Sequence, residues 1–124
     1  MSFNWSDFLE IAELLHSKGK GKTLEQAYFR CALSRAYYAA FIISRKYAES
    51  KGESFEREYG RSHKHVIDYY INSKNPGLQD VGENLKTLKR WRINSDYEDN
   101  PVFNSMTVES SLKYSKNIIS DLKL

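Results

Sequence analysis

The feature that most constrains this chain is an uninterrupted stretch over residues 23–50, which contains no Gly and no Pro. A stretch without either helix breaker predicts one helix of about 28 residues, which spans roughly 42 Å. Thr23 and Gln26 fit the capping-box pattern at its start. Only two Pro and six Gly occur in the 124 residues, and an all-β sandwich or barrel would need many more turn formers.

The middle of this helix, CALSRAYYAAFII at 31–43, is apolar on nearly every side, and only Ser34 and Arg35 interrupt it. A helix that is apolar all round must be covered all round. Since a small bundle covers one broad face, we expect a partner subunit to cover the remainder. Four small side chains would let another helix approach closely: Ala32, Ala36, Ala39 and Ala40.

Helical spacing of apolar residues predicts four further helices, at 4–18, 62–73, 78–94 or a little beyond, and from 107 onward. Asn4, Ser62 and Thr107 are the predicted caps. Polar or Gly- and Pro-containing loops separate the helices at 19–22, 51–61, 75–77 and 98–106. We therefore expect an all-α, antiparallel, up-and-down bundle of four to five helices, with residues 1–124 as one domain.

Composition narrows the function classes. The net charge of +3 is far from the dense basic stripe of a dedicated nucleic-acid binder. The single Cys31 excludes an internal disulfide, and its place in the apolar helix centre predicts inert packing. No run of 18 apolar residues and no signal-like start occur, so we expect a cytoplasmic protein without a membrane span. No nucleotide-loop, zinc-protease or serine-hydrolase motif is present, and no cofactor is expected.

Arg35 is the one charged residue inside the apolar run. A buried guanidinium without a partner is unfavourable, so we expect a structural ion pair, with Asp96 as the preferred partner. The alternative is a binding role, because Arg is well suited to contact phosphate and other anions.

A second polar cluster, KRWRINSDYED at 89–99, lies at a predicted helix end. Arg92 and Asp96 are four residues apart and share a helix face, and so do Arg90 and Tyr97 at seven. Basic residues at a helix end also complement the helix dipole, so a purely structural role stays open. The functional interpretation is a site where Arg binds phosphate and neighbouring side chains hydrogen-bond the ligand: Asn94, Ser95, Asp96 and Tyr97.

His63 and His65 are two residues apart, so they do not share a helix face, and no third ligand is evident. We therefore expect no metal site. Either His could act as a general acid or base near neutral pH. The alternative is an exposed helix start without a chemical role.

Taken together, LSRAYYAAF at 33–41 and RINSDYED at 92–99 resemble the HEPN family, the higher-eukaryote and prokaryote nucleotide-binding domain, and above all its small stand-alone prokaryotic members. The family's segments occur in order along nearly the whole chain. They are W-x-x-[FY]-L-x-x-A (Trp5 to Ala12), S-R-x-Y-Y-A (Ser34 to Ala39), Ser62-His63, and R-x-x-[AS]-D-Y (Arg92 to Tyr97).

This resemblance implies an all-α bundle that dimerises and is linked to a minimal nucleotidyltransferase, often as a toxin–antitoxin pair. Many HEPN proteins are metal-independent ribonucleases, marked by Arg, four to six residues, then His. Here Ser95 fills the His position counted from Arg90, and no His follows Arg92. Tyr97 resembles the tyrosine that the partner transferase modifies in related toxins.

Three hypotheses follow from the sequence. The favoured one is a homodimeric partner of a minimal nucleotidyltransferase that binds a nucleotide or RNA without cleaving it. The second is a metal-independent ribonuclease toxin, in which Arg92 stabilises the scissile phosphate and His63 or Tyr97 transfers protons. The third is a structural interaction domain whose polar cluster only caps a helix.

Overall fold

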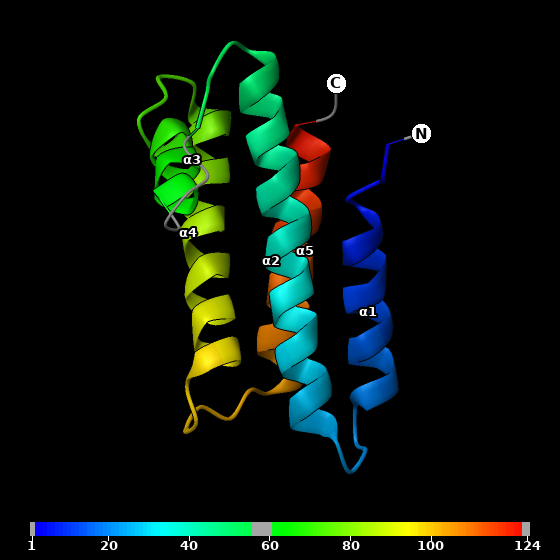
Figure 1. The fold of residues 1–124 in the computed structure, drawn as a ribbon. Helices are drawn as coiled ribbons and strands as arrows, with labels where there is room; N and C mark the ends of the chain where they lie inside the picture. The colour runs from blue at the N-terminus through cyan, green and yellow to red at the C-terminus, as the bar shows by residue number, and fades with distance from the viewer. Residues whose placement is uncertain (1, 56–60, 123–124) are drawn as a thin grey trace.

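The structure is a computed structural model, and it describes residues 2–55 and 61–122. Five helices make up the fold: α1 (Asp7–Gly19), α2 (Glu25–Ser50), α3 (Arg61–Ile71), α4 (Pro76–Tyr97) and α5 (Ser105–Asp121). Helices α1, α2, α4 and α5 alternate in direction, and the short α3 lies beside α4 (Figure 1). The described residues contain no strand, which confirms the predicted all-α, up-and-down bundle.

Helix α2 is the centre of the bundle and contacts all four other helices. Its four small residues, Ala32, Ala36, Ala39 and Ala40, are fully buried, as is Tyr37. The close approach predicted at the alanines is therefore made by helices of the same chain. These alanines therefore need no partner subunit, whereas the side of α2 that carries Cys31 and Arg35 is exposed, and its coverage by a partner stays a prediction.

Cys31 is a second correction on α2. Inert packing in an apolar centre was expected, but the thiol is exposed. It lines a small apolar hollow of about 200 Å³ between α1 and α2, together with Leu15, Leu24, Ala27 and Tyr28. Burial changes from one residue to the next around a helix. A residue in an apolar stretch of sequence can therefore still face solvent.

Helix ends differ in detail from the predicted caps. The capping box of Thr23 and Gln26 does not form, because the Gln26 amide instead pairs with the backbone of Phe103, through bonds of 2.7 and 2.8 Å. Helix α5 is capped by Asn104, whose Oδ1 accepts from the Thr107 amide at 2.8 Å. The Gln26 side chain, which the local pattern assigned to a cap, thus binds a residue that is distant in the sequence.

The predicted caps of the first and third helices are also displaced. The Asn4 Oδ1 accepts from the Ser6 amide at 3.1 Å, in the turn before α1, and Ser6 holds the cap position. Ser62 lies inside α3, which begins at Arg61. The loop expected at 51–61 is described only in part, since residues 56–60 lie outside the described residues.

Gly82 explains how α3 comes to lie against α4. A glycine inside a helix is unfavourable by roughly 1 kcal/mol relative to Ala. Here a Cβ at position 82 would lie 2.7 Å from the backbone nitrogen of Ile71, which is too close for any side chain. The glycine therefore lets the two helices approach closely, and this approach brings the start of α3 to α2 and α4.

The core is built on α2 in two connected parts. One surrounds Tyr37, Tyr70 and Leu85, and the other surrounds Phe29 and Val108. No helix among the described residues is long and apolar enough to span a membrane.

Candidate functional site

Polar and aromatic side chains converge where α4 passes the middle of α2 and the start of α3. Arg92 comes from α4, Tyr37 and Tyr38 from α2, and His63 from α3. The sequence brings them together because residues 37 and 38 lie in the buried helix and Gly82 allows α3 to dock.

Arg92 is the centre of this cluster and is only 7% exposed. Its Cζ lies 5.3 Å from the ring centroid of Tyr38, 5.4 Å from that of Tyr37 and 5.9 Å from that of Tyr97. A guanidinium over an aromatic face is stabilised by the ring quadrupole. Three tyrosines thus form a cage around the charge, which we call the Arg92 cage.

The hydrogen-bonding capacity of this guanidinium is largely unused. Its Nη1 lies 3.8 Å from Oδ2 of Asp96, an ion pair without a hydrogen bond. Its Nε is buried and has no hydrogen-bond partner in the part of the chain that the structure describes. Ser34 donates to the same Asp96 oxygen at 3.3 Å. Because buried charged donors are normally hydrogen-bonded, the guanidinium is suited to an added anionic acceptor.

His63 lies in the cluster rather than at a free helix start. Its Nδ1 shares a 2.7 Å hydrogen bond with the Tyr37 hydroxyl, and its ring stacks on Phe41 at 4.2 Å between centroids. This half-buried position is different from the exposed alternative considered for the sequence. His65 is exposed.

Burial, together with the nearby cations Arg92, Lys89 and Arg45, lowers the pKa of His63 to about 4. The imidazole is therefore neutral at pH 7. Burial also raises the pKa of Tyr37, although Arg92 opposes this, so the phenol keeps its proton. The hydrogen bond between Tyr37 and His63 therefore joins two neutral groups.

The expected burial of Arg35 and its ion pair with Asp96 are both wrong, while the alternative binding role stays a prediction. The Arg35 side chain is exposed, and its Cζ lies 5.2 Å from the ring centroid of Phe8 on α1. Asp96 pairs with Arg92 instead. Consecutive helix residues point about 100° apart, so Ser34 faces α4 while Arg35 turns towards α1.

The other predicted binding residues lie at varying distances from the cage. Arg90 is exposed, and Asn94 is half-buried. The Ser95 hydroxyl is buried and donates to the Arg92 carbonyl at 2.9 Å, so it is occupied within its own helix. Tyr97 forms the open side of the cage and is 71% exposed.

Sequence reasoning missed Arg30, which holds the end of α4 in place. Its Nη1 donates to the carbonyls of Ser95 at 3.0 Å and Glu98 at 2.6 Å, and its Nη2 donates to that of Pro101 at 2.7 Å. These acceptors are backbone groups left free where a helix ends. Since any residue supplies a carbonyl, no side-chain pattern in the sequence could reveal this contact.

The tyrosine pair on α2 was also missed as part of a site. Tyr37 and Tyr38 appear in the S-R-x-Y-Y-A segment, but their aromatic character made them candidates for the core. In the sequence these tyrosines are adjacent to Arg35, which directed the prediction to that residue. In the structure their rings contact Arg92 instead.

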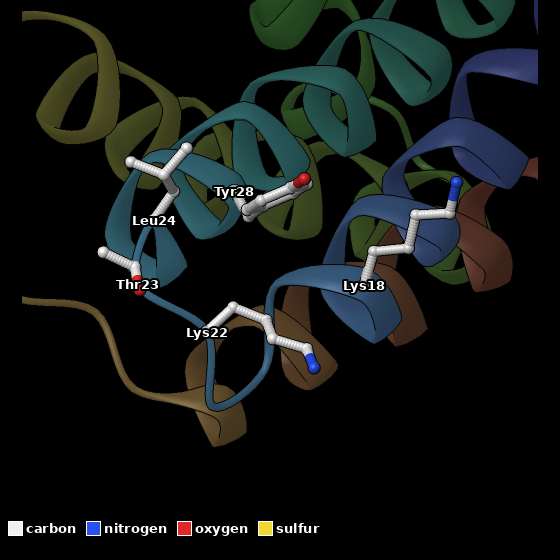
Figure 2. A pocket seen from close by; sticks show the side chains of 5 residues that line it. All are labelled: Lys18, Lys22, Thr23, Leu24 and Tyr28. Atoms are coloured by element: carbon white, nitrogen blue, oxygen red, sulfur yellow. The ribbon is translucent and has the colours of Figure 1, made fainter.

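Another hollow lies between the end of α1 and the start of α2. It measures about 480 Å³ and is lined by Lys18, Lys22, Thr23, Leu24 and Tyr28 (Figure 2). The two ammonium groups do not converge on a common point. We therefore place the candidate site at the Arg92 cage, where a buried charge and three rings meet.

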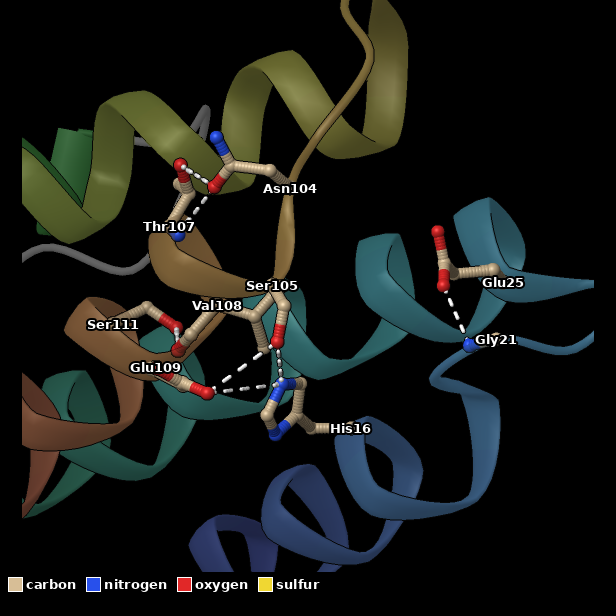
Figure 3. A network of polar contacts seen from close by, with 9 residues as sticks. All are labelled: His16, Gly21, Glu25, Asn104, Ser105, Thr107, Val108, Glu109 and Ser111. Atoms are coloured by element: carbon tan, nitrogen blue, oxygen red, sulfur yellow. Dashed lines mark hydrogen bonds and ion pairs between the residues drawn. The ribbon is translucent and has the colours of Figure 1, made fainter.

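A polar network joins α1 to the start of α5 (Figure 3). The His16 Nε2 lies 2.7 Å from the Ser105 hydroxyl and 4.0 Å from a carboxylate oxygen of Glu109. In a catalytic triad the hydroxyl and the carboxylate bind opposite ring nitrogens. Here both lie at the same nitrogen, so the network is a structural link. The described residues contain no group of three metal-ligating side chains.

Comparison with known proteins identifies the family. The chain matches the HEPN domain over residues 6–124, which is nearly its full length, and it belongs to this family. The resemblance found in the sequence is thereby confirmed. Neither the curated proteins nor the solved structures contain a significant match to the chain.

Proposed function

We propose that this HEPN chain, acting as a single domain over residues 1–124, binds RNA or a nucleotide through a phosphate at Arg92. It does so as the homodimeric, non-cleaving partner of a minimal nucleotidyltransferase in a toxin–antitoxin or defence system. One observation carries the binding proposal: Arg92 is buried within three tyrosine rings and makes no side-chain hydrogen bond to any described residue.

The chemistry of the cage supports a phosphate ligand. A guanidinium binds phosphate through two parallel hydrogen bonds, and those donors are unused here. Tyrosine faces can stack nucleic-acid bases, and the Tyr97 ring is largely open to solvent. Asp96 is the acidic side chain that pairs with Arg92. This ion pair is weak, because the two atoms are 3.8 Å apart and form no hydrogen bond.

The absence of cleavage is supported by the state of His63. With its pKa lowered to about 4, it holds no extra proton to give a leaving group at neutral pH. Its Nδ1 is also engaged by Tyr37.

The nucleotidyltransferase partner is proposed from family membership. The exposed Tyr97 hydroxyl supports a role as acceptor, because a transferase could reach it. In that reaction the phenol would give its proton to a base of the transferase, and its oxygen would bond to the α-phosphorus of a nucleoside triphosphate as the bond to pyrophosphate breaks.

Binding is tested by fluorescence anisotropy with a labelled octa-adenylate. Arg92→Lys keeps the charge but loses the bidentate geometry, and we expect about tenfold weaker binding or more, since hydrogen bonds to charged groups contribute about 1.5–3 kcal/mol. Lys116→Gln, an exposed change on α5, serves as the control and should bind as the wild type does. Thermal melts of both variants verify folding. Equal affinity of wild type and Arg92→Lys, or no binding by the wild type, overturns the proposal.

A metal-independent ribonuclease is the second candidate, because the structure brings His63 from another helix to the Arg92 cage. The test is incubation of a mixed RNA pool with excess EDTA. The proposal expects intact RNA. Cleavage by the wild type that disappears in Arg92→Lys would favour the ribonuclease.

A further inference from the structure

A groove between α3 and α4 is lined by basic and apolar side chains. It measures about 320 Å³ and is lined by Lys64, Ile67, Asp68, Ile71, Lys86 and Lys89. Three lysines, one aspartate and two isoleucines thus share one hollow.

The charge of this groove is not balanced. Lys64 pairs with Asp68 at 2.8 Å, one helical turn away on α3. Lys86 and Lys89 have no ion-pair partner among the residues that the structure describes. The groove therefore has two uncompensated positive charges, a local feature that the chain's overall charge of +3 does not reveal.

The groove lies next to the Arg92 cage along α4, although no side chain of the cage lines it. Lys86, Lys89 and Arg92 follow one another along α4 at intervals of three residues, a rise of about 4.5 Å per interval. Lys64 directly follows His63 on α3. Lys89 is also close enough to His63 to lower its pKa, which places the inner end of the groove beside the cage.

We propose that this groove is a second phosphate subsite, and that the ligand of the Arg92 cage is a single-stranded RNA segment rather than a mononucleotide. The backbone of the strand runs from Arg92 past Lys89 to Lys86. Lysines act as point charges and track phosphates without reading sequence, while the two isoleucines accept sugar and base surfaces. The inference rests on the proposed function, because it extends the same ligand beyond the cage.

The salt dependence of binding tests the subsite. Each phosphate neutralised on a single strand contributes about 0.7 to the slope of log K against log salt concentration. We expect Lys86→Gln/Lys89→Gln to reduce the slope for labelled octa-adenylate by about 1.4, and to weaken binding by about 25-fold near 0.1 M salt. The matched control is Lys113→Gln/Lys116→Gln, which removes the same charge from exposed positions on α5.

The outcomes separate the two proposals. If the groove variant and the α5 control have the same slope while Arg92→Lys still loses binding, the subsite is wrong and the proposed function stands. If the wild type does not bind octa-adenylate, both are wrong.

Asp68→Asn provides a test of opposite sign, because it releases Lys64 from its ion pair. We expect tighter octa-adenylate binding and a steeper salt slope. Asp121→Asn removes an equal charge from the exposed end of α5 and is the control. If the two variants have the same effect, the change in binding comes from the net charge of the chain and not from the groove. This result would overturn the subsite.

Discussion

At the scale of single residues, the site depends on two groups in unusual environments. The charge of Arg92 is stabilised inside the bundle by three tyrosine rings and Asp96. His63 remains neutral because burial and neighbouring cations oppose its protonation. The same cations that disfavour a proton on His63 favour a phosphate beside it, so the two environments support one function.

His63 should make folding stability depend on pH. Its pKa is about 4 in the folded chain and about 6.5 in an unfolded one, so the unfolded state binds the proton first as the pH falls. We expect stability to decrease from about pH 6.5 to about pH 4, by at most about 1.4 kcal/mol per pH unit for one group. Urea unfolding at several pH values measures this.

His63→Asn is the control for that measurement, because other groups also titrate in this range. The difference between wild type and variant should change with pH only in the stated window. A constant difference across pH 4 to 7 would show that His63 titrates normally, and an NMR titration of its ring protons would confirm it.

At the scale of elements, the end of α4 depends on one side chain from α2. Arg30 binds backbone carbonyls on both sides of the turn that follows Tyr97. This holds Asp96 and Tyr97 in position through the backbone, since the acceptors are carbonyl groups. Arg30 is therefore a positioning residue for the open side of the cage.

We expect Arg30→Met to destabilise the fold by about 2 kcal/mol, since it removes several hydrogen bonds to a charged group. Amides of residues 94–101 should exchange faster with deuterium, while those in the middle of α2 stay protected. Arg35→Met is the matched control, because that side chain is exposed and only covers Phe8. Equal exchange in both variants would contradict the positioning role.

Helix positions were largely predictable from sequence, and helix contacts were not. The observed ends lie within about three residues of the predicted ones, because Gly, Pro and apolar spacing act locally. Gln26 shows the limit: its local pattern fits a capping box, yet it binds Phe103, 77 residues away. Such a contact depends on how helices pack, which no local pattern contains.

At the scale of the whole molecule, the proposed homodimer needs an exposed surface. The face of α2 that carries Ala32, Ala36, Ala39 and Ala40 is buried within the chain, while the side with Cys31 and Arg35 is exposed. Large apolar side chains remain exposed elsewhere, among them Ile11, Leu14, Leu24, Val102 and Met106. The proposed homodimer could bury these side chains, since they are apolar and open to solvent.

The proposed homodimer is tested by size-exclusion chromatography with light scattering. We expect twice the chain mass of 14.5 kDa at micromolar concentration. Leu14→Glu places a charge on the exposed part of α1 without entering the core, and would test whether that surface is used. A monomer at all concentrations would remove the homodimer from the proposed function and leave the Arg92 cage intact.

The sequence by itself determined the all-α class, the approximate helices and the family. These depend on helix breakers, periodicity and short motifs, which act over a few residues. Only the tertiary structure decided that Arg92 is buried and Arg35 is exposed. Ser34 and Arg35 point about 100° apart around α2, so Arg35 turns away from α4 when Ser34 faces it. It also decided that His63 joins Arg92, because Gly82 allows α3 to dock against α4. The burial of Arg92 and the lowered pKa of His63 both depend on side chains from neighbouring helices. These properties of the candidate site therefore follow from how the helices pack.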